Sequence, residues 1–374
     1  MFDLSPDEIQ ETVVETLHGF AEAEIRPAAR EAEAAKEVPE RITKQVAEMG
    51  FGASVPEEFG GSGVFDAVTT VLIAEELAWG DPGIAASILW AGQPALLISL
   101  AGTDDQRAAS LEPFTTGAKG SVLMYERDGD PVSPRTVARK FGSDWKIDGE
   151  KVCVPSPSGA DTRIVIAGIE GSDEIGAFVL PKSASAKVKR DDSDAGKIGL
   201  RAAHTGVVDF DGVIIPGDSI LGGDARNPRT LQRAIGICRL QTGAIALGLA
   251  RAAVEYAAEY ASDRVAFGKP IGAFQGVAFM VTDMAMDVDA TRLLIWDAAS
   301  QLDAGDSAER AVELANSKAT KTAMRCGTDS VQVLGGHGYI VDHPVEKWYR
   351  DAGVLASIEG TLSADPHLAA AYAG

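Results

Sequence analysis

The pattern of apolar residues changes twice along this chain, from helical to strand-like and back to helical, and this order limits the folds that the chain can adopt. Residues 1–118 carry apolar positions at the spacing of helices. Residues 119–224 contain short β-rich runs separated by Gly, Asp, Ser and Pro, which predict a small barrel or sandwich of half-buried antiparallel strands. Residues 225–374 return to a helical pattern. We therefore expect three domains with these bounds, in an α+β fold that is mainly α.

Local patterns place several helix ends. Ser5, followed by Pro6 and Glu8, is typical of a helix N-cap with proline at the first helical position. The segment VPEEFGGSG (55–63) predicts a break between helices, because proline and glycine interrupt helical structure. In the last domain the pattern predicts three long helices, over about 231–264, 274–304 and 308–334.

The charge of the chain argues against several classes of partner. Its 374 residues include 34 basic and 55 acidic side chains, for a net charge of −21. Such an acidic surface repels nucleic-acid phosphates and anionic lipid head groups, so we expect neither nucleic acid nor a membrane as a partner. We also interpret the apolar runs as too short to span a bilayer.

The cysteines, histidines and N-terminus predict a protein without disulfides or bound metal. Cys153, Cys238 and Cys326 lie far apart, and the five histidines lack metal-ligand spacing. Residues 1–17 are acidic and amphipathic, unlike a signal or transit peptide. We therefore expect no metal site, reduced thiols and a cytoplasmic location.

Several segments resemble the acyl-CoA dehydrogenases, and they occur in the order found in that family. Together they cover nearly the whole chain. The segments are AGTDDQRAASLEPFTTG (101–117), WKIDGEKVCV (145–154), IGLRAAHTGVVDFDGVIIPGDSILG (198–222), RVAFGKPIGAFQGVAFMVTDM (264–284) and VQVLGGHGYIVDHPVEKWYRDAGVLASIEGT (331–361).

The resemblance implies a fold, a reaction and partners. The fold is an N-terminal helical domain, a middle β-barrel and a C-terminal four-helix bundle. The reaction is FAD-dependent α,β-dehydrogenation of an acyl-CoA thioester to the trans-2-enoyl-CoA. The family usually forms homotetramers with FAD at a subunit interface, and its members pass electrons to an electron-transfer flavoprotein.

The resemblance also implies the catalytic and substrate-binding residues. Glu359 in the segment IEGT matches the base that removes the α-proton while hydride leaves for flavin N5. Some family members carry this base on a long helix just before an arginine, and here that position is Cys238, which favours Glu359. Arg239 matches the arginine that binds the CoA arm, and Gly360 is expected to contact the substrate beside the base.

The expected FAD contacts divide into two groups. Residues that match those reaching the FAD of a neighbouring subunit are Arg264, Phe267, Gln275, Gln332, Gly335 and Gly336. Residues expected to contact the FAD from other parts of the chain are Tyr125, Ser156 and Thr361. A fixed arginine can neutralise a pyrophosphate, and paired glycines let backbone N–H groups approach phosphate oxygens.

The β-domain part of this site departs from the family pattern. The loop YERDGDP (125–131) retains only Glu126 of the family's T-E-P-G-x-G-S-D motif. In the second loop Cys153 and Pro155 replace an aromatic residue and a Thr or Ser, and proline has no N–H to donate to a flavin. Two alternatives therefore stay open. One is a flavin-poor subunit of a heterotetramer with a paralogous chain, and the other is an acyl-thioester oxidase or acyl-carrier-protein dehydrogenase.

The acyl group itself is not specified by these motifs. The segment ILWAGQPALLISLAG (88–102) is a candidate wall of the acyl cavity. Within it, the small residues Ala91 and Gly92 predict room for a bulky acyl tail.

Overall fold

The computed structural model describes residues 6–127, 130–191 and 196–358. The first helix begins at Glu8, and its N-cap is Asp7, whose carboxylate accepts from the backbone N–H groups of Ile9 and Gln10. The predicted cap at Ser5 is therefore wrong. The N-terminal helices are α1 (Glu8–Phe20), which continues through a π-helical turn (Ala21–Ile25) into α2 (Arg26–Ala35), then α3 (Glu40–Glu48), α4 (Ala67–Gly80), α5 (Pro82–Ala101) and α6 (Asp104–Ser110).

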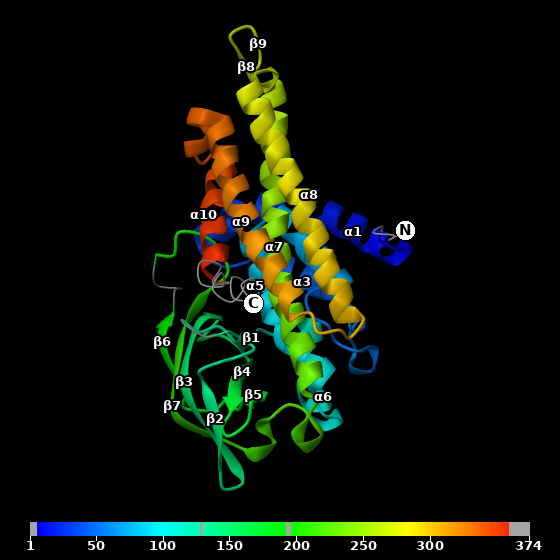
Figure 1. The fold of residues 1–374 in the computed structure, drawn as a ribbon, viewed down its shortest axis with the longest axis vertical. Helices are drawn as coiled ribbons and strands as arrows, with labels where there is room; N and C mark the ends of the chain where they lie inside the picture. The colour runs from blue at the N-terminus through cyan, green and yellow to red at the C-terminus, as the bar shows by residue number, and fades with distance from the viewer. Residues whose placement is uncertain (1–5, 128–129, 192–195, 359–374) are drawn as a thin grey trace, which may run out of the picture.

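A curled seven-stranded sheet is formed by the middle part of the chain and lies at one end of the molecule (Figure 1). Its strands are β1 (Gly120–Leu123), β2 (Val137–Phe141), β3 (Asp144–Pro155), β4 (Thr162–Ile169), β5 (Ile175–Leu180), β6 (Lys187–Asp191) and β7 (Thr205–Ile215). The strand order is β1-β4-β2-β3-β7-β6, with β5 also pairing β4. We expected antiparallel strands, but β4 pairs in parallel with both β1 and β2. Apolar side chains inside the curl, among them Trp145, Ile147 and Phe178, give this part a hydrophobic core of its own.

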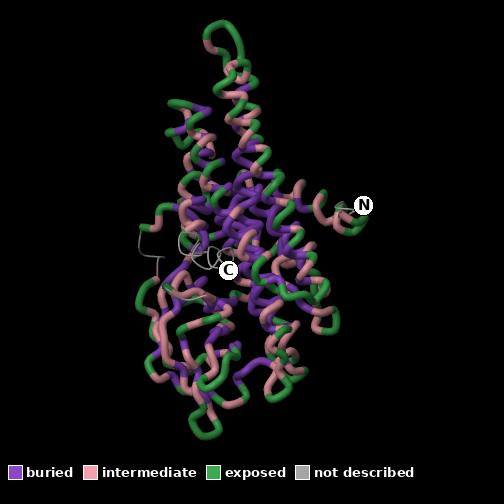
Figure 2. The backbone as a smooth tube through the Cα atoms, viewed as in Figure 1, coloured by how far each residue is buried: buried purple, intermediate pink, exposed green. Residues whose placement is uncertain are grey.

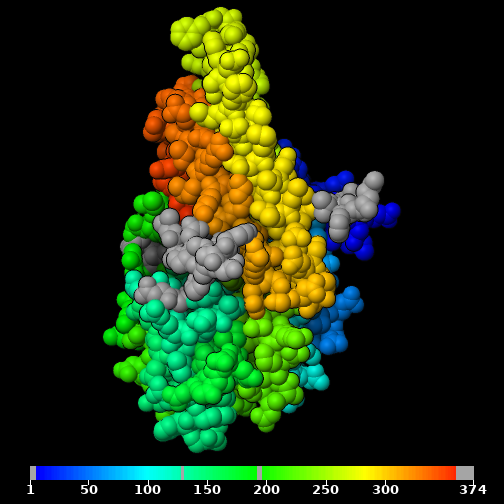
Figure 3. All heavy atoms as spheres, in the orientation of Figure 1, coloured from blue at the N-terminus to red at the C-terminus, as the bar shows by residue number. Residues whose placement is uncertain are grey.

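Up to residue 358, four helices make the C-terminal bundle, and a short hairpin extends from it. The helices are α7 (Pro228–Asp263), α8 (Gln275–Asp303), α9 (Glu309–Leu334) and α10 (Val345–Ile358). The hairpin strands β8 (Val265–Ala266) and β9 (Lys269–Pro270) join α7 to α8. This hairpin projects beyond the bundle in the space-filling view (Figure 3). The predicted helices over 274–304 and 308–334 correspond to α8 and α9.

Helix α7 lies at the centre of the molecule and packs against α4, α5, α8 and α9. Glycines on α7 make these approaches possible: a Cβ added at Gly248 would lie 2.3 Å from the Glu75 carbonyl oxygen of α4. The N-terminal and C-terminal helices therefore share one hydrophobic core, which Figure 2 shows as the buried centre of the tube.

Two helices, α5 and α7, are long and apolar enough to cross a membrane by length and composition. The sequence interpretation that no apolar run reaches this length was therefore wrong. In the folded chain, however, 78% of the apolar window of α5 and 94% of that of α7 are buried against other parts of the protein. Both helices serve as core helices in this fold.

A buried ionic cluster fixes α10 against the rest of the molecule. The Lys347 ammonium donates to Asp81 at 2.5 Å and to Asp351 at 2.7 Å, and all three side chains are almost completely buried. Asp351 also accepts from the backbone N–H of Leu200 at 2.6 Å. The cluster therefore joins the start of α5, the segment before β7 and α10, the helix that leads to residue 359.

Candidate active site

A groove of about 520 Å³ lies between the first turns of α7 and the turn that connects α8 to α9. Val132, in the loop after β1, contributes to its wall from the sheet side. Arg239, the predicted substrate-binding arginine, lines the groove and is only 6% exposed. Its guanidinium donates to Glu313 of α9 at 2.8 Å. The groove thus places a buried cation beside a space large enough for an extended ligand.

The outer wall of this groove is held by a second arginine. Arg233 donates to the Leu302 carbonyl oxygen at 2.7 Å and to the Asp303 carboxylate at 3.0 Å. Asp303 in turn accepts from the backbone N–H groups of Ala67 and Val68 at the start of α4. These four hydrogen bonds hold the last residues of α8, Leu302 and Asp303, against α7 and the start of α4.

The sheet presents the predicted flavin-contacting loops to the helices. Tyr125 follows β1, and its carbonyl oxygen accepts from the Val152 N–H of β3 at 2.9 Å. Tyr125, Val132 and Cys153 all pack against the helical core. The loop after β1 and the end of β3 therefore lie side by side where the sheet packs against the helices.

The one family position retained in the first loop, Glu126, forms a buried ion pair. Its carboxylate accepts from the Lys151 ammonium at 2.7 Å and from the backbone N–H groups of Arg135 and Thr136 at 2.6 and 2.9 Å. Lys151 is fully buried, and burial lowers its pKa to about 8 although the Glu126 charge acts in the opposite direction. Burial also acts to raise the pKa of Glu126, but the charge and hydrogen bonds of its partners outweigh it and lower that pKa.

Replacing Lys151 with methionine should destabilise the protein strongly. The substitution leaves the Glu126 carboxylate buried without its cation, which typically costs about 3–5 kcal/mol of unfolding free energy. Because burial lowers the folded-state pKa of Lys151 below its unfolded value, the wild type should also gain stability over this variant as pH rises from about 8 to 10.5. Urea denaturation at several pH values measures both effects.

A double variant provides the control for this prediction. Adding Glu126→Gln to Lys151→Met removes the orphaned charge and keeps one side-chain carbonyl oxygen, which can replace the acceptor of either the Arg135 or the Thr136 amide, so stability should partly return. Equal stability of the wild type and the Lys151→Met variant would contradict a structural role for this ion pair.

Ser156, which was predicted to compensate for Pro155, lies at a different cavity. Its backbone adopts a left-handed conformation (φ 43°), and its N–H donates to the His204 carbonyl oxygen at 3.0 Å. The residue lines a recess of about 80 Å³ between the sheet and the N-terminal helices, together with Ala91 and His204. The structure therefore gives Tyr125 and Cys153 contacts with the shared helical core, whereas Ser156 lines the recess beside the N-terminal helices.

The second group of predicted cofactor residues lies at the far end of the bundle. The group is exposed and consists of Arg264, Phe267, Gln275, Gln332, Gly335 and Gly336. Phe267 stands at the tip of the β8–β9 hairpin and is 97% exposed. Among the described residues, no heavy atom lies within 4 Å of a Cβ built at Gly335 or Gly336. An exposed cation beside open backbone suits a large anionic cofactor approaching from outside the chain.

The two groups of predicted FAD contacts are too far apart to hold one cofactor molecule within a single chain. Tyr125 and Ser156 belong to the sheet, whereas Arg264 follows the last residue of α7, 25 residues (264 minus 239) or roughly 37 Å along the helix from the substrate-groove residue Arg239 at 1.5 Å per residue. Figure 1 shows the sheet and the β8–β9 hairpin at opposite ends of the molecule. If both groups bind FAD, each FAD must therefore be completed by a second subunit.

The predicted base and its neighbours, Glu359, Gly360 and Thr361, lie outside the described residues. The structure does place the helix that leads to them: α10 ends at the buried Ile358, and its final turns approach the sheet in Figure 1.

Comparison with known proteins assigns the family. Residues 7–118 match the acyl-CoA dehydrogenase N-terminal domain, and residues 229–364 match the acyl-CoA dehydrogenase C-terminal domain. The chain is 34% identical to a probable acyl-CoA dehydrogenase of Mycobacterium leprae over 96% of this chain and 94% of that protein. It is also 30% identical to the human mitochondrial short-chain specific acyl-CoA dehydrogenase, over 95% of this chain and 87% of that protein.

Solved structures agree with this assignment. Butyryl-CoA dehydrogenase from Megasphaera elsdenii superposes with a TM-score of 0.82 at 26% identity, over 98% of this chain and all of that one. Glutaryl-CoA dehydrogenase from Mycobacterium smegmatis gives a TM-score of 0.82 at 27% identity, over 96% and 93% of the two chains. The fold and site define a flavin-dependent oxidoreductase that uses FAD. The chain belongs to the acyl-CoA dehydrogenase family.

Proposed function

We propose that the protein catalyses the FAD-dependent α,β-dehydrogenation of an acyl-CoA thioester to the trans-2-enoyl-CoA. The observation that carries this proposal is the groove with buried Arg239 on its wall, formed where the loop after β1 meets α7. An acyl-CoA needs a large site with a cation close to it, and this groove of about 520 Å³ carries Arg239 on its wall. Arg229 and Arg233 line the same groove, so its three arginines outnumber its two acidic lining residues, Asp306 and Glu309.

In this proposal the residues of the chain bind the substrate and move one proton. Glu359 removes the α-proton of the thioester, and Arg239 and the backbone at Gly360 orient the CoA arm and the thioester. Hydrogen bonds to the thioester oxygen stabilise the negative charge that develops as the α-proton leaves. FAD, when bound, supplies the acceptor for the β-hydrogen as hydride. The open backbone at Gly335 and Gly336 and the exposed Arg264 are the groups that would hold it.

We further propose that the protein acts as a homotetramer and passes electrons to an electron-transfer flavoprotein. Helix α8 supports the assembly, because Phe279, Met286 and Leu293 are exposed and recur every seven residues on one helix face. Val265 and Phe267 on the hairpin are exposed apolar side chains as well, and exposed apolar side chains that gather on one surface are typical of protein interfaces.

Anaerobic titration of the purified protein tests the proposed reaction. An acyl-CoA such as butyryl-CoA should bleach the yellow flavin absorbance and yield the enoyl thioester, whereas free CoA should not. Flavin-loaded protein that no acyl-CoA bleaches would contradict the proposal. Rapid release of peroxide in air would instead favour the oxidase alternative.

A second candidate is the flavin-poor subunit of a heterotetramer. The observation that favours it is the sheet side of the site, where Pro155 has no N–H and the Ser156 N–H is already bonded to the His204 carbonyl oxygen. By contrast, the second group of predicted cofactor residues, around Arg264, is exposed, and its residues match the family pattern. A chain with only the distal half would complete a cofactor site on a different partner chain.

A further inference from the structure

Two tyrosines of α7 hold the segment that follows α9. Tyr256 and Tyr260 are four residues apart and therefore lie on one face of the helix. The Tyr260 hydroxyl is hydrogen-bonded to His337 Nδ1, and the Tyr256 hydroxyl to His343 Nδ1, both at 2.7 Å. The two imidazole rings stack, with centroids 5.2 Å apart and planes inclined by 17°. These four half-buried side chains form what we call the tyrosine–histidine clasp.

The clasp holds the inner side of the predicted cofactor turn, Gly335–Tyr339, of which His337 is the middle residue. A second inner contact is at Gly338, where an added Cβ would lie 2.4 Å from the Val331 carbonyl oxygen of α9. Cβ atoms added at the first two residues of the turn would meet no described residue within 4 Å, their chain neighbours aside. The turn is thus packed against the protein on one side and open on the other, where an approaching cofactor would meet its backbone.

The two ends of the clasp are not equivalent. His337 lies within the turn, whereas His343 lies beyond it. Arg30 of α2 also holds the His343 end, because its guanidinium donates to the Val341 and His343 carbonyl oxygens at 2.9 and 3.0 Å. The Tyr260 hydroxyl is therefore the contact on which the turn itself depends.

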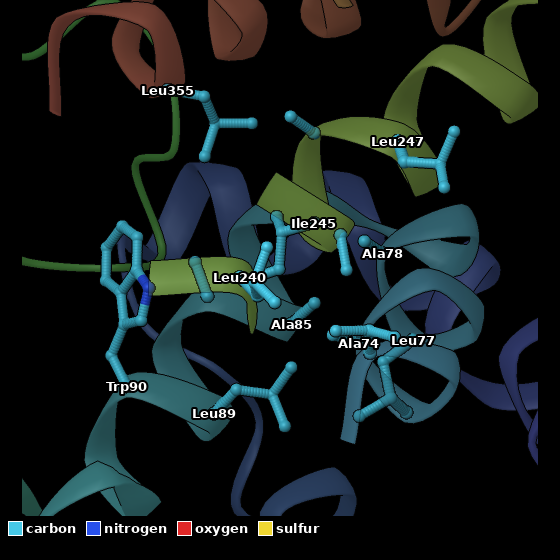
Figure 4. Close-up of a cluster of buried hydrophobic side chains, with 14 of the residues drawn as sticks. Ala74, Leu77, Ala78, Ala85, Leu89, Trp90, Leu240, Ile245, Leu247 and Leu355 are labelled. Carbon is cyan, nitrogen blue, oxygen red and sulfur yellow. The ribbon is translucent and has the colours of Figure 1, made fainter. Parts of the chain in front are cut away.

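Helix α10 does not depend on the clasp for its position. The buried Lys347 pairs with Asp81 and Asp351. Leu355 belongs to the cluster of buried hydrophobic side chains in Figure 4, together with Leu240 of α7. Loss of a clasp hydroxyl should therefore loosen the turn without unfolding the bundle, and water can bond the half-buried histidine nitrogen in its place.

We propose that Tyr260 is a positioning residue for the FAD of a neighbouring subunit: through His337 it holds the turn Gly335–Tyr339 in the shape that receives the cofactor. The inference rests on the proposed function, because it takes this turn as part of the FAD site. A cofactor that meets a turn already held in place does not have to order it on binding, so it binds more tightly.

Release of FAD from the holoenzyme tests this proposal. On dilution into buffer without flavin, the Tyr260→Phe variant should release FAD about tenfold faster than the wild type or more, because only a loosened turn remains. The rise in flavin fluorescence measures the rate. Thr322→Val is the matched control, because it removes one buried hydroxyl, bonded to Thr291 at 2.9 Å between α8 and α9 of the same bundle. This control should release FAD at the wild-type rate.

Variants of His337 show whether Tyr260 acts through it. His337→Phe removes the bond from its other side, so it should release FAD as fast as Tyr260→Phe. The double variant should be no more than about twofold faster than either single variant, since both remove one interaction. His337→Asn keeps a polar atom near the position of Nδ1 and should restore part of the wild-type retention.

The outcomes separate the inference from the function on which it rests. Release at the wild-type rate from folded Tyr260→Phe protein overturns the inference. Equal acceleration in Thr322→Val, or effects that add fully in the double variant, also overturn it. If Tyr260→Phe does not fold, His337→Phe decides in the same way, because it lacks the same hydrogen bond. Protein that binds no FAD and turns over no acyl-CoA overturns the proposed function, and the inference with it.

Discussion

Replacing Glu359 with glutamine should lower the rate of flavin reduction by acyl-CoA by roughly 10⁴-fold or more, the upper end of the usual range of 10²–10⁴-fold for loss of a general base. Glutamine has nearly the shape of glutamate but cannot accept the α-proton, so FAD content and binding of the CoA thioester should change little. Rapid mixing of the oxidised, flavin-loaded variant with butyryl-CoA under anaerobic conditions measures the rate directly.

Glu313 provides the matched control for this experiment. Its carboxylate forms an ion pair with Arg239, which lines the groove. Glu313 was not identified as a site residue from the sequence. If Glu359 is the base, Glu313→Gln should weaken substrate binding through Arg239 but retain reduction at saturating substrate. Full turnover in Glu359→Gln together with loss of reduction in Glu313→Gln would transfer the role of base to Glu313.

Replacing Arg264 with alanine should lower flavin occupancy and the fraction of assembled oligomer together. A cofactor held between subunits stabilises only the assembled state. By mass action, weaker FAD binding therefore weakens the oligomer, and a weaker oligomer binds less FAD. Flavin absorbance per chain and sedimentation velocity measure the two quantities on the same sample. We expect a loss of most bound FAD at micromolar protein concentration.

Lys269→Ala is the control on the same hairpin. Lys269 is exposed, but its ammonium lies over the Phe274 ring and donates to the Ala273 carbonyl oxygen, so it serves the local hairpin. This variant should keep its FAD and its assembly. Normal FAD content in a stable Arg264→Ala oligomer, with unchanged circular dichroism, would contradict the cofactor role of Arg264.

The same flavin count distinguishes a homotetramer from a heterotetramer. One tightly bound FAD per chain in protein expressed alone, with acyl-CoA turnover, supports the homotetramer and excludes the flavin-poor subunit. A colourless chain that acquires FAD only with a paralogous partner supports the alternative.

The helical periodicity predicted α8 and α9 to within a few residues, because long helices repeat their apolar pattern many times. Strand direction was not predictable in this way. The alternation of apolar and polar residues shows which face of β4 is buried. It carries no information on whether β1 runs parallel or antiparallel to β4. The cap was misplaced because Ser5 and Asp7 are both good N-cap residues, and only the hydrogen bonds of Asp7 decide between them.

The candidate site was predictable only in part. Short motifs identify Arg239 and Arg264, but the distance between them depends on α7 being one unbroken helix. The buried Lys151 could have been found, because it shares the inward parity of Trp145 and Ile147 on β3. A charged residue at an inward position implies a buried partner of opposite charge, here Glu126.

The central position of α7 has a consequence for the order in which the chain can fold during synthesis. Helices α4 and α5 leave the ribosome early, yet both are buried on nearly all sides, and much of that burial is against α7. The sheet is synthesised after α5 and before α7, and it has a hydrophobic core of its own, so it can fold before α7 emerges. Until residues 228–263 emerge, the faces of α4 and α5 that pack on α7 have no native cover, so the nascent chain exposes apolar surface of the kind that favours aggregation and binds chaperones.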